Sequence, residues 1–443
     1  MKKLLTVSIL LLVASTVAMS QWQERRVYSP YRALRYVDNT FGINGFTIDG
    51  QGKLWIAPLE AVDTLSPPGK QRRQIIVLHP DGTPASFSPI RTLTIGVTID
   101  SLAQNSYGLS RDHEGNILFC TFNDLYRINQ QTGAAMNFFA DVQSSSIGAV
   151  GVDAAGDIFA NRVVGSATPI KILDKDFVLL PSNAVDTNRT IARKITVSAD
   201  GTRLYVPNIY GTKQVVVYGN DLGPGFGLYT PVDTILVGMQ VESMAWQPRP
   251  GNPPLLWASA GSRENPPDSM YRESVWYGLN LSTNTIVDSI DWGVTFPANP
   301  VWDDTVANAQ RRRCRGIEFT STGDTAYVAM FLRDSNSVKM FTKLPTSVDP
   351  VSNLVPDGYA LSQNYPNPFN PTTEIEFSIP TAGFTTLKVY DLLGREVATL
   401  VSENLSPGTF RTRLDGSRFA SGTYVYRLVS SATQITRKML LLK

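Results

Sequence analysis

Side chains that commonly do chemistry are sparse in this chain of 443 residues. Its two histidines, His79 and His113, stand beside glycine-containing turns, and the sequence has no His-Glu-x-x-His or Cys-x-x-Cys spacing that would predict a zinc site. It also lacks the Gly-x-Ser-x-Gly elbow of serine hydrolases, and His113 has no evident nucleophile as a partner. We therefore interpret both histidines as solvated turn residues.

Carboxylates are more numerous, and several of them recur in one pattern. Asp49, Asp112 and Asp153 each stand three positions before a glycine. A carboxylate that repeats in this way suits the capping of a turn better than it suits a single catalytic centre. The pair Asp303 and Asp304 could do acid–base chemistry only if a cleft held both side chains, and the sequence predicts no such cleft.

Tryptophans offer a better lead to a binding site. Trp276, Trp292 and Trp302 follow a polar insertion at residues 262–274. Aromatic side chains could stack on sugars or anchor peptides, and binding residues concentrate on loops that a rigid scaffold holds in place. The alternative is that these tryptophans pack in the core.

The elements that must position these residues follow a repeat between residues 45 and 330. Each copy reads as a short strand, often an Asp, a Gly three positions later, and an apolar strand. Glycine supplies the positive φ of a tight turn, and the flanking β-branched and aromatic residues favour antiparallel strands. The copies lie at Gly52, Gly115, Gly156, Gly201, Gly251 and Gly323, with spacings of 63, 41, 45, 50 and 72 residues.

A period of about 40–50 residues with four strands is typical of a β-propeller blade. Six copies predict a six-bladed β-propeller, and seven blades remain possible because the two longest spacings could contain a worn copy. The segment Arg32–Val37 is expected to pair with the last blade and close the ring. The repeat resembles the broad group of six-bladed propellers that includes NHL-repeat and gluconolactonase-like proteins. Its motif is only a turn pattern, so the resemblance indicates architecture and not activity.

The same resemblance implies a candidate metal site. Gluconolactonase-like propellers hold calcium in their central channel with oxygen ligands from the ends of inner strands. Asn44, Asn105 and Glu242 occupy such places here, and carboxylate and amide oxygens suit a hard cation such as Ca2+. The alternative is that all three are ordinary polar loop residues.

The N-terminus is typical of a secretory signal peptide at residues 1–20. A positive start and an apolar run at residues 4–17 precede small residues at positions 18 and 20. Export implies an oxidising compartment, yet the chain has only Cys120 and Cys314, which we interpret as buried free thiols in preference to a disulfide. The net charge of +2 and the lack of a concentrated basic stripe argue against nucleic acid as a partner.

Beyond a linker at residues 346–360, the segment at 361–443 alternates polar and apolar residues in six short runs. The alternation predicts a compact β-sandwich. The strand candidates are residues 374–378, 386–390, 396–400, 409–413, 423–428 and 436–442.

This unit closely resembles the type A C-terminal sorting domain of the type IX secretion system of Bacteroidetes and related bacteria. The residues that we interpret as the sorting signal are Asn364, Tyr365, Pro366, Asn367, Pro368, Phe369, Asn370, Pro371, Tyr390, Asp391, Gly394, Gly422, Tyr424, Lys438 and Lys443. The resemblance implies that signal peptidase and an export translocon deliver the chain to the periplasm. It also implies that the outer-membrane type IX translocon recognises the folded tail, which a sortase usually removes. Residues 365–371 are expected to form a stiff extended segment that could present a recognition edge.

The sequence therefore predicts an all-β protein with a signal peptide at residues 1–20, a β-propeller at 21–345, a linker at 346–360 and a sorting domain at 361–443. We expect the propeller to be a non-catalytic binding or scaffold module, delivered to the outer cell surface or the medium. The alternative is a calcium-dependent lactonase-like hydrolase, which needs three or four oxygen ligands converging on the central channel. A third interpretation, a component of a larger surface assembly, needs exposed apolar patches.

Overall fold

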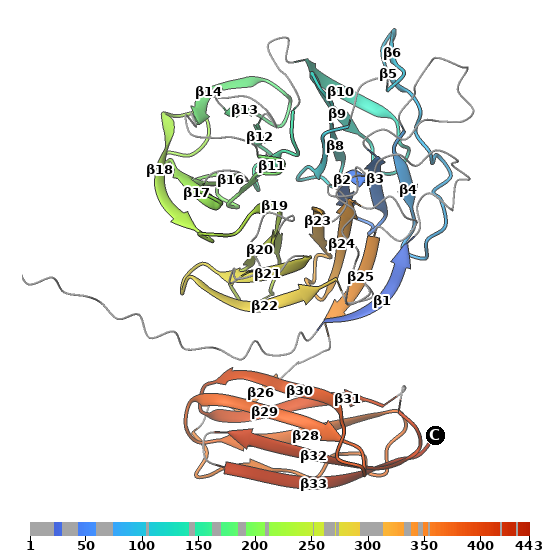
Figure 1. Ribbon diagram of the computed structural model, residues 1–443, viewed down its shortest axis with the longest axis vertical. Helices are drawn as coiled ribbons and strands as arrows, with labels where there is room; N and C mark the ends of the chain where they lie inside the picture. Colours follow the sequence, from blue (N-terminus) through green and yellow to red (C-terminus); the bar gives the residue numbers. More distant parts are fainter. Residues whose placement is uncertain are drawn as a thin grey trace, which may run out of the picture. The chain divides into compact units, whose positions relative to one another are not determined.

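The computed structural model describes residues 22–28, 43–58, 74–102, 106–140, 147–161, 170–184, 192–208, 212–250, 252–260, 271, 274–292, 313–331, 338–343, 349–352, 355–416, 419–430 and 433–443. All the regular secondary structure within these ranges is β-strand, which confirms the all-β class. None of these residues forms a helix with the length and apolar character that spanning a membrane requires. The structure divides into two compact units, one of them Trp22–Lys343 and the other containing Leu344–Lys443 (Figure 1).

The larger unit has six groups of strands within its described residues, and in each group successive strands pair antiparallel. Numbered 1 to 6, the groups are β2 (Ile43–Ile48), β3 (Leu54–Pro58) and β4 (Ile76–Leu78); β7 (Gly108–Arg111), β8 (Ile117–Cys120), β9 (Asp124–Ile128) and β10 (Ala135–Ala140); β11 (Gly151–Val152), β12 (Ile158–Ala160), β13 (Ile170–Leu173) and β14 (Leu179–Ala184); β15 (Thr196–Val197), β16 (Arg203–Asn208), β17 (Gln214–Gly219) and β18 (Leu228–Ile235); β19 (Val241–Gln247), β20 (Leu255–Ala260), β21 (Val275–Asn280) and β22 (Thr285–Asp291); and β23 (Arg313–Phe319), β24 (Thr325–Phe331) and β25 (Val338–Lys343). A hairpin of β5 (Leu93–Ile95) and β6 (Thr98–Asp100) lies between groups 1 and 2 in the chain.

Two pairings depart from this simple succession. β1 (Trp22–Tyr28) pairs antiparallel with β25 and becomes the fourth strand of group 6. The expectation that residues 32–37 take this position is therefore wrong: those residues lie outside the described ranges, and β1 occupies the edge of β25. In addition, β14 and β18 pair in parallel at Asn183 and Ala184, which joins groups 3 and 4 into one eight-stranded sheet.

Clusters of buried side chains lie between the groups, and each of six clusters draws on two successive groups. Trp257 of group 5 and Phe319 of group 6 share one cluster, with their ring centroids 5.4 Å apart. Phe46 of group 1 and Tyr327 of group 6 share another, so the last group packs against the first. Figure 1 shows the groups around a common centre, with β2, β11, β19 and β23 on the inside.

The strand period explains how one group contributes to two clusters. Leu54 and Ile56 of β3 belong to the cluster shared with group 6, whereas Trp55 between them belongs to the cluster shared with group 2. Successive side chains of a strand point to opposite faces, and both faces are covered here. Burial of a side chain such as Ile56 stabilises the fold by roughly 1.5–3 kcal/mol.

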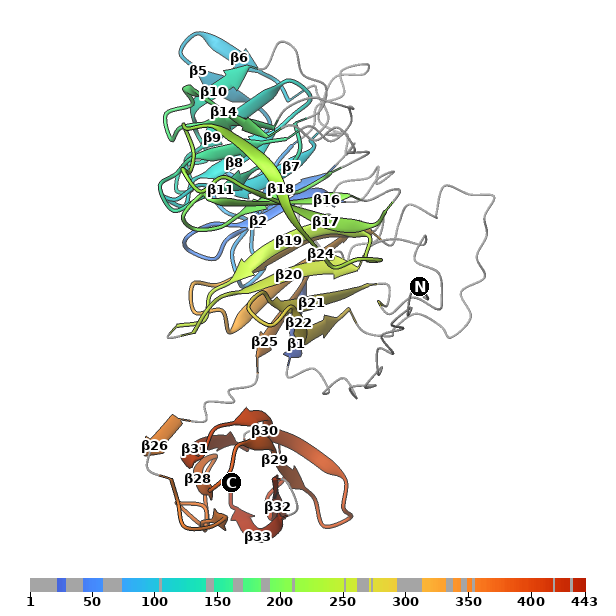
Figure 2. The ribbon, with the colours of Figure 1, turned by 90° about the vertical axis from the view of Figure 1, so that its left-hand side faces the viewer.

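The smaller unit is a β-sandwich of two sheets, as the sequence predicts. One sheet has the order β26-β31-β28-β27 and the other β30-β29-β32-β33, and Figure 2 views them nearly along their strands. Buried residues of both sheets form a single core between them. The strands are β26 (Asp349–Ser352), β27 (Ala360–Leu361), β28 (Thr372–Ile379), β29 (Gly383–Tyr390), β30 (Glu396–Leu405), β31 (Gly408–Asp415), β32 (Gly422–Ser430) and β33 (Thr433–Leu441).

All six strand candidates of the tail are confirmed: five lie within a longer strand, and the sixth, 436–442, matches β33 except for its last residue. The expected linker at 346–360 is only partly a linker, because β26 lies inside it and pairs with β31 from Asp349 to Ser352. Sequence reasoning missed this strand because Pro350, which lacks a backbone donor, reads as a strand breaker. As an edge strand with a single neighbour, β26 tolerates proline.

Candidate functional site

The residues of the expected sorting signal gather at one end of the β-sandwich. Tyr390, at the end of β29, pairs with Val425 near the start of β32, and Gly422 pairs with Leu441 at the end of β33. Phe369 also bridges to Leu441. The register therefore brings residues 363–371, 391–395, 419–422 and 441–443 to the same end, which we call the motif end. In Figure 1 it is the end of the sandwich at which C marks the terminus.

Asn364 holds the proline-rich segment from inside. Its side chain is buried, and Nδ2 donates to the carbonyl of Pro366 at 3.0 Å and to Thr373 Oγ1 at 2.9 Å. Its backbone N–H donates to the phenol oxygen of Tyr426 at 2.9 Å, and this phenol donates to the carbonyl of Ser362 at 2.8 Å. Because buried amides are stable only when hydrogen bonded, Asn364 ties the segment to β28 and β32.

The rest of the segment covers the C-terminal end of the open edge of β33. The Phe369 N–H donates to the carbonyl of Leu440 at 2.9 Å, and the Leu442 N–H donates to the carbonyl of Phe369 at 3.0 Å. The Leu440 N–H donates to Asn367 Oδ1 at 2.9 Å. An uncovered strand edge is a template for pairing with other chains, and here the molecule covers its own.

This arrangement corrects the expectation of a continuous stiff extended segment. The chain bends between its bridges at Tyr365 and Phe369, and the Tyr365–Pro366 and Asn367–Pro368 peptide bonds are cis. The Phe369 side chain is buried in the sandwich core. Gly416 allows close packing beside it, because a Cβ at that position would make a tight contact of 3.0 Å with the Phe369 ring.

The motif residues therefore fall into three classes. Asn364, Phe369 and Tyr424 are buried, and the Tyr424 phenol donates to the carbonyl of Ala420 at 2.8 Å. Tyr390, Asp391 and Gly422 are partly exposed. The exposed residues are Tyr365, Pro366, Asn367, Pro368, Asn370, Pro371, Gly394, Lys438 and Lys443. Only the exposed and partly exposed classes can meet another molecule without unfolding of the sandwich.

Asp391 organises the turn between β29 and β30. Its Oδ1 accepts hydrogen bonds from the N–H of Leu393 at 2.9 Å and of Arg395 at 3.0 Å, and its Oδ2 lies 2.7 Å from Arg395 Nε. The backbone N–H of Arg395 accordingly lowers the pKa of Asp391. Gly394 has φ +78°, which favours glycine. Sequence reasoning named Asp391 and Gly394 as motif residues but gave no weight to the two leucines between them. It therefore missed that this turn exposes two apolar side chains at its tip.

Two of the three candidate calcium ligands are described, and their contacts do not fit a metal site. Glu242 of β19 is buried and forms ion pairs with Arg315 and, at 3.6 Å to Nε, with Arg193. Asn44 Nδ2 donates to the backbone carbonyl of Ser106 at 2.5 Å. Asn105 lies outside the described residues. Two guanidinium groups beside Glu242 oppose the approach of a cation.

A third ion pair links groups that are not neighbours in the chain. Lys194 Nζ, just before β15 of group 4, lies 2.6 Å from Glu318 Oε1 on β23 of group 6. With the Glu242 pairs, it connects the inner strands of groups 4, 5 and 6. Within the described ranges, no group of three or more His, Cys, Asp or Glu side chains is placed to hold a metal ion.

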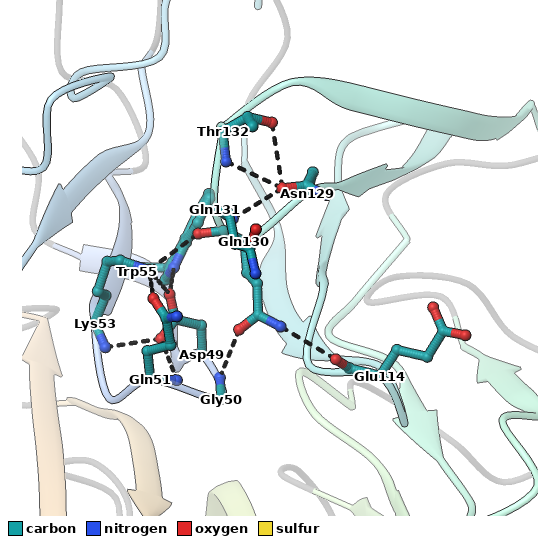
Figure 3. Close-up of polar contacts among 10 residues, drawn as sticks. All are labelled: Asp49, Gly50, Gln51, Lys53, Trp55, Glu114, Asn129, Gln130, Gln131 and Thr132. Carbon is teal, nitrogen blue, oxygen red and sulfur yellow. Dashed lines mark hydrogen bonds and ion pairs between the residues drawn. The ribbon is translucent and has the colours of Figure 1, made fainter.

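The recurrent carboxylates cap turns, as the sequence predicts. Asp49 Oδ1 accepts from the N–H of Gln51 and of Lys53 at 2.9 Å each, and Oδ2 accepts from Trp55 Nε1 at 3.0 Å (Figure 3). Asp112 and Asp153 cap their own turns in the same way. The glycines that follow, Gly52, Gly115 and Gly156, all have positive φ. These carboxylates are therefore fully used by the fold.

Figure 3 also shows how one side chain joins two groups. Gln130 Oε1 accepts from the N–H of Gly50 at 3.0 Å in group 1, while its Nε2 donates to the carbonyl of Glu114 at 3.1 Å in group 2. Lys53 Nζ donates to the Gln130 carbonyl at 3.1 Å and pairs with Asp49 at 2.9 Å. These polar contacts hold groups 1 and 2 together.

The candidate binding tryptophans belong to the core wherever they are described. Trp276 and Trp292 are buried in the cluster between groups 5 and 6, with ring centroids 6.1 Å apart. The expectation that these two line a binding loop is therefore wrong, because Trp276 on β21 and Trp292, just after β22, both pack in the core. Trp302 lies outside the described residues.

The histidines and cysteines also have structural surroundings. His113 is exposed, and a Cβ on Gly156 of group 3 would lie 2.5 Å from its Nδ1, while His79 is half-buried. Cys120 and Cys314 are free buried thiols, as expected. Burial raises the pKa of the Cys120 thiol to about 12, so it is neutral at physiological pH.

Two solved structures resemble the chain at low sequence identity. A chain of the "Crystal Structure of Mitotic Checkpoint Complex" is 13% identical, with 78% of this chain and 98% of that chain covered and a TM-score of 0.42. The extracellular domain of a putative hybrid two component system from B. thetaiotaomicron is 10% identical, with 96% of this chain and 58% of that chain covered and a TM-score of 0.40. Neither title names an NHL-repeat or gluconolactonase-like protein. No curated protein matches the chain.

The tail matches a known protein family. Residues 363–442 match the family described as the secretion system C-terminal sorting domain. The matched range begins with the proline-rich segment and ends one residue beyond β33, so it contains the motif end except for Lys443. The C-terminal unit of this chain is therefore a sorting domain of that family, which suggests export by type IX secretion to the cell surface or the medium.

Proposed function

We propose that this protein is an exported six-bladed β-propeller that serves as a non-catalytic binding or scaffold module after type IX secretion. Signal peptidase and the export translocon deliver it to the periplasm. The type IX translocon then recognises the sandwich, and a sortase removes it. The observation that carries the proposal is the sorting-domain match at residues 363–442, together with the convergence of its motif residues on one end of a folded unit.

The propeller architecture is supported by the packing of the larger unit. Six buried clusters each join successive groups of strands, and one of them joins group 6 to group 1. β1 completes group 6, which would fasten a ring by pairing the start of the chain with its last blade. On this interpretation the six groups are the six blades.

A binding role is favoured over hydrolysis by the charges near the inner strands. The lactonase alternative needs oxygen ligands that are free to hold calcium, but the Glu242 carboxylate is shared by two arginines. Lys194 and Glu318 likewise neutralise each other. These pairs join groups 4, 5 and 6 to one another, which suits a rigid scaffold.

The export route is tested by deleting residues 361–443 in a bacterium that has a type IX secretion system. We expect the truncated chain to accumulate in the periplasm with a folded propeller, whereas the full chain reaches the surface or the medium. Immunoblots of the periplasm, the surface and the medium measure the distribution. Normal display of the truncated chain would contradict the sorting assignment.

A further inference from the structure

The turn between β29 and β30 exposes two large apolar side chains that the fold does not require. Leu392 is 72% exposed and Leu393 is 80% exposed. The conformation of the turn depends on its flanking residues, because Asp391 accepts the turn N–H groups and Gly394 adopts the positive φ. Polar residues are the usual choice at the two tip positions. The leucines therefore call for an explanation outside the stability of the turn.

The turn is held in one shape before any partner arrives. Asp391 fixes it through two backbone hydrogen bonds, and the Arg395 guanidinium closes on the same carboxylate at 2.7 Å. A preorganised loop loses little conformational entropy on docking. Two adjacent exposed apolar side chains on such a loop can serve as anchors, because their apolar surface leaves water when they enter a pocket.

The surroundings of the leucines indicate the chemistry of the partner. Leu442 is 50% exposed and Tyr365 is 82% exposed at the same end of the sandwich. β33 lies two strands from β29 in the sheet, so its end is roughly 10 Å from the turn. The exposed cations Lys438 and Lys443 belong to this end as well. Glu396, which pairs with Tyr390, and Asp415, which pairs with Thr372, add exposed carboxylates near this end. The surface thus combines apolar anchors with polar groups of both signs.

We propose that Leu392 and Leu393 insert together into an apolar pocket on the type IX secretion machinery. This inference rests on the proposed function, since the sorting-domain match at residues 363–442 is what identifies the machinery as the partner. The proline-rich segment then serves mainly to build the motif end, while the leucine turn makes the decisive contact.

The test compares export of full-length variants in a bacterium that has the secretion system. The double variant Leu392→Ser/Leu393→Ser is expected to reduce export at least tenfold and to accumulate in the periplasm. The double variant Leu392→Met/Leu393→Met keeps apolar side chains and is expected to export normally. The matched control is Phe384→Ser, which removes a 52% exposed apolar side chain at the opposite end of β29 and is expected to leave export unchanged.

Several outcomes would overturn the inference. Export of the serine variant within twofold of wild type would show that the leucines are not needed for recognition. If the 361–443 deletion variant still accumulates in the periplasm, the proposed function is retained in that case. Free export of the deletion would remove both proposals together. An equal loss in Phe384→Ser, or a clearly lower melting temperature of the purified serine variant, would assign the effect to folding. A dimer that dissociates on the serine substitution would assign the leucines to self-association.

Discussion

The backbone N–H of Asn364 donates a hydrogen bond at 2.9 Å to the phenol oxygen of Tyr426, 62 residues further along the chain. The same phenol donates to the carbonyl of Ser362, so one side chain of β32 fixes the segment at two points. Asn364 then fixes Pro366 and Thr373. The buried residues of the sorting signal are thus folding determinants of the sandwich, and they position the exposed ones.

Removal of the Tyr426 hydroxyl is expected to loosen the motif end. Tyr426→Phe leaves the Asn364 N–H and the Ser362 carbonyl without their partner in a buried place, which costs about 1–3 kcal/mol of unfolding free energy. Hydrogen exchange of the β32 amides in the full chain measures the change. Tyr390→Phe is the matched control, because it keeps the ring that lies 5.0 Å from the Arg427 guanidinium. Equal effects of both variants would refute the role of the hydroxyl.

Glycine at position 201 is expected to matter for two separable reasons. Its φ of +73° disfavours a side chain, and a Cβ would lie 2.6 Å from Asp153 Oδ2 and 2.8 Å from Pro224. Gly201→Ala should therefore combine roughly 1 kcal/mol of backbone strain with 1–3 kcal/mol of overpacking. Gly238→Ala isolates the strain, because Gly238 has φ +87° with open space around its Cβ position. Thermal unfolding of both variants should rank Gly201→Ala as the less stable; the reverse order would contradict the packing argument.

The charge of Glu242 is expected to stabilise the larger unit. Glu242→Gln keeps the shape of the side chain but leaves the buried Arg315 without its carboxylate. Breaking a buried ion pair in this way typically lowers the free energy of unfolding by about 3–5 kcal/mol. The control Asp221→Asn breaks an exposed pair with Arg203 and should leave the melting temperature unchanged. Millimolar CaCl2 should not stabilise the wild-type protein. If CaCl2 raised the melting temperature of the wild-type protein but not that of Glu242→Gln, the lactonase-like alternative would instead be favoured.

The two cysteines are expected to be inert in the folded protein. Cys120 and Cys314 are both buried, and burial raises the pKa of the Cys120 thiol to about 12, which removes the reactive thiolate at pH 8. A chromogenic thiol reagent should therefore find no reactive thiol before unfolding and two after addition of guanidinium chloride. Detection of no thiol after unfolding without reductant would show that the cysteines are oxidised.

Local rules recovered much of the fold from the sequence. The Asp-x-x-Gly pattern around Asp49 and Gly52 predicts a turn because each residue meets a requirement of the backbone, and both do so in the structure. Strict alternation predicts all six main strands of the tail. β1 was missed because its alternation is weak: Trp22 and Tyr28 are buried, but the residues between them are largely exposed.

The candidate sites were harder to predict, because residue type alone does not reveal partners. Glu242 has the character of a metal ligand in the sequence, and only the fold brings Arg193 and Arg315 to it from distant strands. Trp276 has the character of a binding residue until β21 places it inside. By contrast, Leu392 and Leu393 could have been noticed, since an apolar pair between a capping Asp and a Gly breaks the usual composition of a turn.

The cover over β33 has a consequence for the order of events in the cell. The three hydrogen bonds that hold Asn367 and Phe369 against this edge come from Leu440 and Leu442, which the ribosome adds more than 70 residues after Asn367. A polypeptide that terminates before Leu440 has none of them and leaves the edge of its sheet open. The motif end therefore cannot assemble on a prematurely terminated product, and a receptor that requires it would reject such chains without any separate proofreading step.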